Sequence, residues 1–68
     1  MKLTVETEQE EDGRWIAEIL EIPGALKYAA TREEAIAQAE ALALRVIADR
    51  IEHGESPTEP IHITFAAA

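Results

Sequence analysis

Carboxylate side chains are the residues of this chain that could do chemistry. Two-metal hydrolysis of phosphodiesters needs several carboxylates that converge on divalent cations about 4 Å apart. Glu6 and Glu8 lie in an alternating segment that predicts a strand, and Glu40 interrupts the apolar sector of a predicted helix. The last predicted strand adds His62 and Thr64 but no carboxylate. A solvated acidic face is the favoured interpretation, so we expect no catalytic residue and predict that the chain is not an enzyme.

The two histidines do not have the spacing of metal ligands. His53 stands at the end of a predicted helix, one turn after Asp49, where a protonated imidazole favours the helix dipole. His62 alternates with Ile61 and Ile63, as an exposed strand residue does. The chain has no cysteine pair, no Gly-rich phosphate loop and no His-x-x-x-His motif. We therefore expect neither a metal site nor a cofactor.

Size and charge limit the classes of partner. A single domain of 68 residues buries only about 60% of its unfolded surface, and without cysteines, self-association is the remaining source of stability that the composition permits. Fourteen acidic residues against six basic ones give a net charge of -8, which disfavours direct binding to nucleic acid and attracts basic proteins. No apolar run has the length of a signal peptide or a membrane span, so we expect a cytoplasmic protein.

Alternation and turn residues predict four strands. Residues 3–8 and 14–20 alternate at period two around a charged turn that ends at Gly13. Pro23 and Gly24 end the second strand, and residues 26–29 form a short third one. Residues 61–65 alternate again after a loop at 55–60, and residues 66–68 are expected to be a tail.

One long helix is predicted between the third and fourth strands. Thr31 has the position of an N-cap, residues 32–53 contain no Pro or Gly, and Gly54 follows as a left-handed terminator. The apolar sector of this helix is wider than one sheet face needs. The order β-β-β-α-β predicts an α+β fold with one helix packed on a four-stranded mixed sheet. The last strand should return parallel to the first through a right-handed crossover.

Three segments together resemble the HicB-like antitoxin family, in particular its N-terminal domain. They are an aromatic-hydrophobic-Ala-Glu strand, a Pro-Gly turn and a Thr-x-x-Glu-Ala helix start, here at residues 12–18, 21–24 and 30–35. The likeness covers residues 1–65. It implies a truncated RNase H-like fold, oligomers, and the neutralisation of a small basic HicA-type ribonuclease toxin by covering its RNA-binding surface. Full-length members commonly carry a C-terminal DNA-binding module, which we expect this chain to lack after its fourth strand.

Two groups of residues are candidate interaction sites. The first is apolar and would serve self-association, because the side chains of one broad helix face cannot all reach one sheet. It comprises Trp15, Tyr28, Leu42, Leu44, Val46 and Ala48. The second is acidic and would face a basic toxin; it comprises Glu8, Glu10, Glu11 and Asp12.

The alternatives to these sites stay open. Core packing is the simpler interpretation of Trp15, and a solvated turn is the simpler interpretation of the acidic run. A stand-alone oligomer of the same fold without a toxin, acting as a scaffold or small-ligand binder, is the alternative function. A residual nuclease built on Glu6, Glu8 and Glu40 is the third.

Overall fold

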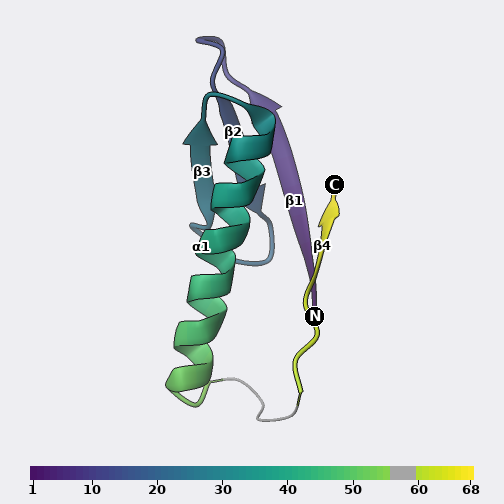
Figure 1. The fold of residues 1–68 in the computed structure, drawn as a ribbon, viewed down its shortest axis with the longest axis vertical. Helices are drawn as coiled ribbons and strands as arrows, with labels where there is room; N and C mark the ends of the chain where they lie inside the picture. The colour runs from purple at the N-terminus through teal and green to yellow at the C-terminus, as the bar shows by residue number, and fades with distance from the viewer. Residues whose placement is uncertain (56–59) are drawn as a thin grey trace.

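The computed structural model describes residues 1–55 and 60–68. One helix packs on a four-stranded mixed sheet, in the order β-β-β-α-β (Figure 1). The elements are β1 (Lys2–Gln9), β2 (Trp15–Ile19), β3 (Leu26–Ala29), α1 (Arg32–Glu52) and β4 (Thr64–Ala67). The α+β class and the element order predicted from the sequence are therefore confirmed.

The sheet has the strand order β3-β2-β1-β4. β1, β2 and β3 are antiparallel neighbours, and β4 pairs in parallel with the first half of β1, from Lys2 opposite Thr64 onward. This is the predicted place for the last strand. The strand itself lies later than the predicted 61–65, because Ala66 and Ala67 pair with β1 and do not form a tail. Its extent is set by its parallel pairing with residues 2–5 of β1, a tertiary contact that the alternation within residues 61–65 does not reveal.

Local hydrogen bonds explain where α1 begins and ends. Thr31 has extended backbone angles, and its hydroxyl oxygen accepts a hydrogen bond of 3.1 Å from the Glu34 N–H. At the other end the chain turns at Gly54, whose φ is +72°, and the Glu55 N–H donates to the Arg50 carbonyl at 2.9 Å. The 21 residues between these caps form one unbroken helix, as predicted.

Alanines bring α1 close to the sheet. Ala35, Ala39 and Ala43 recur at intervals of four on one face of the helix and are fully buried, as is Ala17 on β2. Small side chains on both surfaces shorten the distance between helix and sheet. Larger apolar residues complete the core; they are Leu3, Val5, Ile19, Ile22 and Ile47.

In the part of the chain that the structure describes, one face of the sheet is covered and the other is not. α1 packs mainly over β2 and β3, as Figure 1 shows. With 21 residues the helix is about 31 Å long, whereas the five residues of β2 span about 17 Å. The helix therefore extends past the end of β2, and the molecule measures 42 × 19 × 16 Å. No element of the described residues packs on the opposite sheet face.

The turn between β2 and β3 corrects one sequence expectation. The alternation of residues 14–20, continued to residue 22, predicts Ile22 partly on the sheet face opposite Trp15. In the structure β2 ends at Ile19, and Ile22 lies in the core with 4% exposure. The Ile19 N–H donates to the Ala25 carbonyl at 2.9 Å, so the chain folds back beneath the helix and directs Ile22 inward.

Candidate functional site

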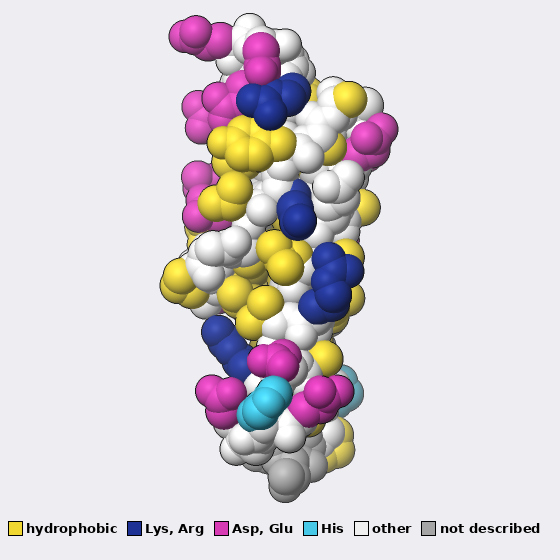
Figure 2. Space-filling model, turned by 90° about the vertical axis from the view of Figure 1, so that its left-hand side faces the viewer, with side chains coloured by type: hydrophobic (Ala, Val, Ile, Leu, Met, Phe, Trp, Pro, Cys, Tyr) yellow, Lys and Arg dark blue, Asp and Glu magenta, His cyan; other side chains and the backbone are white. Residues whose placement is uncertain are grey.

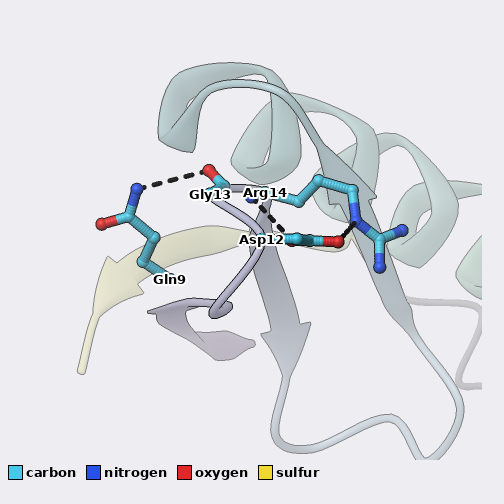
Figure 3. Close-up of polar contacts among 4 residues, drawn as sticks. All are labelled: Gln9, Asp12, Gly13 and Arg14. Carbon is cyan, nitrogen blue, oxygen red and sulfur yellow. Dashed lines mark hydrogen bonds and ion pairs between the residues drawn. The ribbon is translucent and has the colours of Figure 1, made fainter.

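The β1–β2 turn is held by its own acidic and basic side chains. Asp12 accepts a hydrogen bond of 3.0 Å from the Arg14 N–H and a second, of 2.7 Å, from Arg14 Nε (Figure 3). Gln9 Nε2 donates to the Gly13 carbonyl at 3.3 Å, and Gly13 has a φ of +92°. These contacts give the turn a defined shape with its carboxylates on the outside.

Asp12 differs from the other carboxylates of this turn. Hydrogen bonds from the Arg14 N–H and guanidinium lower the pKa of Asp12 below its usual value. Glu8, Glu10 and Glu11 have no ion pair within the described residues. Together with Gln9 and Arg14, all four acidic residues line a shallow open hollow at this end of the molecule. The predicted acidic group is therefore one continuous surface, and three of its charges are available to a partner.

Arg14 links this turn to the sheet. Its guanidinium carbon lies 4.8 Å from the centre of the Tyr28 ring, within the range of a cation–π interaction. Tyr28 on β3 is 44% exposed and lies opposite Ile16 in the β2–β3 ladder. Tyr28 is thus a surface aromatic residue whose ring is already in contact with one cation.

The uncovered side of the sheet combines apolar and acidic residues. We call it the open sheet face; it presents Ile16, Leu20, Leu26 and Tyr28 beside Glu6, Glu8 and Glu18. Alternation places all seven opposite the buried residues of β1 and β2. In Figure 2, exposed hydrophobic side chains with Lys and Arg among them occupy the middle of the neighbouring β3 side, and acidic side chains gather toward its ends. Leu20, Leu26 and Glu18 were not singled out from the sequence, and Glu6 was considered only as a nuclease carboxylate, although the alternation of both faces of residues 14–20 was the available signal.

Trp15 lies on the other side of the sheet. It is half-buried and packs against the core beneath α1. Its neighbours on the adjacent strands are Gln9 on β1 and Ala29 on β3. Trp15 and Tyr28 therefore belong to opposite faces and cannot form one binding surface.

The four candidate interface residues on α1 divide into two pairs. Leu42 and Val46 are half-buried and pack against the core of their own chain. Leu44 is 45% exposed, and Ala48 is exposed as well. Ile51, one turn after Ala48, is 43% exposed. Only the second pair, extended by Ile51, offers a free apolar surface on the helix.

The carboxylates considered for metal-dependent hydrolysis do not meet. Glu6 and Glu8 belong to the open sheet face, whereas Glu40 is on α1, which packs on the opposite face. The sheet lies between them. Among the residues that the structure describes, no three His, Cys, Asp or Glu side chains come together as a group that could hold a metal ion.

The histidines have local roles. His53 caps α1, and its Nδ1 lies 2.7 Å from the Asp49 carbonyl oxygen and 3.4 Å from Asp49 Oδ1, as predicted from their spacing. His62 is exposed, and its carbonyl oxygen accepts a hydrogen bond from the amino group of Met1.

Comparison with known proteins adds no relative. No protein-family model, no curated protein and no solved structure matches this chain. Within the described residues, the single long helix is not apolar enough to span a lipid bilayer. The geometry of the chain is therefore the basis for the function proposed below.

Proposed function

We propose that this chain is an antitoxin-type binding domain of HicB-like character. It would neutralise a small basic ribonuclease of the HicA type by covering the surface with which that enzyme binds RNA. The observation that carries the proposal is the acidic turn between β1 and β2, where three unpaired carboxylates border an uncovered sheet face.

Charge explains how such a domain would act. A ribonuclease that binds phosphates presents Lys and Arg, and a protein of net charge -8 attracts that surface at long range. In the proposed complex, Glu10 and Glu11 would occupy the toxin surface that otherwise binds RNA phosphates. Blocking is then steric and electrostatic and needs no catalytic group, in keeping with the separation of Glu6 and Glu8 from Glu40 by the sheet.

The test is co-expression with a HicA-type toxin encoded beside the gene of this chain. We expect the two proteins to co-purify at low salt, the complex to dissociate as salt rises, and RNA cleavage by the toxin to stop at equimolar ratio. Glu10→Gln with Glu11→Gln should weaken inhibition about tenfold. The matched control removes the same charge at the far end of α1, by Glu52→Gln with Glu55→Gln. Equal loss in both variants, or no inhibition by the wild type, contradicts the proposal.

A second candidate is a stand-alone oligomer without a toxin, acting as a scaffold or a small-ligand binder. The exposed apolar surface formed by Leu44, Ala48 and Ile51 favours it. Sedimentation at micromolar concentration should show a dimer or larger species that Leu44→Lys dissociates. Gln38→Lys, which adds the same charge at an exposed position of α1, should leave the oligomer intact. A monomeric wild type excludes this candidate.

A further inference from the structure

We propose that the open sheet face is a docking surface for a basic protein, which places a Lys or Arg side chain between Glu6 and Glu18 and an apolar strip on Leu26 and Tyr28. The class of partner rests on the proposed function. The location of the docking surface is a separate claim, because the proposed function requires only that the acidic turn bind a basic protein and does not require the sheet.

Apolar exposure on this face is the first argument. Leu20 is 47%, Leu26 36% and Tyr28 44% exposed, and all three follow the alternation that separates this face from the core. The half-buried Ile16 lies opposite Tyr28 in the ladder and extends the apolar strip of β3 onto β2. In a chain whose sheet has only one helix, nothing else in the described residues covers this strip.

The acidic half of the face is the second argument. Glu6 on β1 and Glu18 on β2 are direct cross-strand neighbours, and like charges in that arrangement destabilise a sheet. Glu8 follows on the same side of β1, opposite Ile16. None of the three forms an ion pair within the described residues. A cation from outside would convert this repulsion into two attractive contacts.

Charge also decides between a basic partner and a second copy of this chain. Two copies joined through this face would bring Glu6, Glu8 and Glu18 of both together. The available cations cannot compensate them, because Arg14 is already paired with Asp12 and stacked on Tyr28. Lys2 lies at the far end of β1. A partner with Lys or Arg beside apolar residues matches both halves of the face.

The dimensions limit how the partner docks. Three strands about 4.8 Å apart and about 17 Å long give this face a projected area of roughly 250 Å². A standard interface buries about 800 Å² on each partner. Docking must therefore continue onto an adjoining surface, and Glu8 belongs both to this face and to the hollow at the acidic turn. The expected complex covers both surfaces and is sensitive to salt.

The experiment is an NMR titration of the isotopically labelled chain with a catalytically inactive variant of a HicA-type toxin. We expect shifts at Ile16, Glu18, Leu26 and Tyr28 in addition to the turn. Shifts confined to residues 9–14 or to α1 overturn the inference while leaving the proposed function in place.

A second probe covers the case in which no toxin binds. A synthetic β-hairpin peptide that displays Lys and Val on one face should still shift the same residues of the open sheet face, and a Glu/Val hairpin should not. Absence of shifts with the Lys/Val hairpin as well, or equal shifts with both, overturns the inference. Failure with the toxin but not with the Lys/Val hairpin counts against the proposed function alone.

Two charge variants separate docking from folding. E6Q/E18Q should weaken binding of the Lys/Val hairpin about tenfold, whereas E52Q/E55Q, with the same change in net charge, should change it less than twofold. Glu18→Lys should abolish this binding and raise the melting temperature of the chain alone by a few degrees, because it replaces a like-charge pair with an opposite one. Retained binding, or a lower melting temperature, in Glu18→Lys contradicts the proposal.

Discussion

Replacing Ala39 by Leu tests whether alanines set the distance between α1 and the sheet. Ala39 is fully buried, one turn from Ala35 and from Ala43 on the helix face that packs on the sheet, and Ala17 on β2 is fully buried as well. Leucine adds three carbons where no free space exists, and overpacking of this kind costs about 1–3 kcal/mol. Helix propensity cannot explain such a loss, since Ala and Leu are both strong helix formers.

The size of the chain makes this cost easy to measure. A domain of 68 residues has a free energy of unfolding of about 3–10 kcal/mol. Each kcal/mol shifts the melting temperature of so small a domain by about 4–8 °C. Ala39→Leu should therefore lower it by roughly 5–20 °C. Urea unfolding followed by helix circular dichroism and by the fluorescence of Trp15, the single tryptophan, should give the same loss.

Ala37→Leu is the matched control, because Ala37 is exposed on the same helix. We expect it to change the free energy of unfolding by less than about 0.5 kcal/mol. Both variants are compared at one protein concentration and again at a tenfold dilution, since self-association raises apparent stability. If Ala39→Leu unfolds at the same urea concentration as Ala37→Leu, the close packing of helix on sheet is refuted.

Two further predictions concern hydrogen bonds at exposed positions. Thr31→Ala should lower the free energy of unfolding, measured by urea titration, by about 1 kcal/mol because the N-cap hydrogen bond is lost. Thr31→Ser keeps the capping hydroxyl and should lose much less, and equal losses in both variants would contradict a capping role. Glu21 accepts hydrogen bonds of 2.7 Å from the Thr4 N–H and hydroxyl, which lower its pKa from the usual 4.5. Its charge therefore stabilises the fold above that pH, and stability is lost as pH falls through the lowered value. Glu21→Gln should have a lower free energy of unfolding than the wild type at pH 7, and this difference should shrink below pH 4.5. Urea unfolding from pH 7 to pH 3 measures the difference, and a constant value would exclude this linkage.

Elements with strong local signals were predictable. The N-cap at Thr31, the absence of Pro and Gly before Gly54 and the spacing of alanines define α1 almost to the residue. Alternation located β1, and β3 has the predicted bounds. The position of β4 depends on which residues of β1 it pairs with, a tertiary property that alternation within residues 61–65 does not contain.

The site was predictable only in part. The acidic run from Glu8 to Asp12 could be located because a charged turn must be exposed. Its joining to the sheet through Arg14 and Tyr28 depends on how β2 and β3 pair, which no single segment reveals. The division of the broad apolar helix face between core and surface was not predictable either. Leu42 and Val46 pack against the core, whereas Leu44 and Ala48 are exposed. This difference depends on which side of α1 faces the sheet.

The parallel ladder between β1 and β4 joins the two ends of the chain. During synthesis, β1, β2, β3 and α1 can pair and pack in the order in which they leave the ribosome. β1, however, keeps one edge bare until residues 64–67 have emerged. We therefore expect completion of the sheet to be the last step of folding, since the contacts with the greatest sequence separation carry the largest loop-closure entropy. Until then, the bare edge of β1 is exposed to any extended strand that reaches it first.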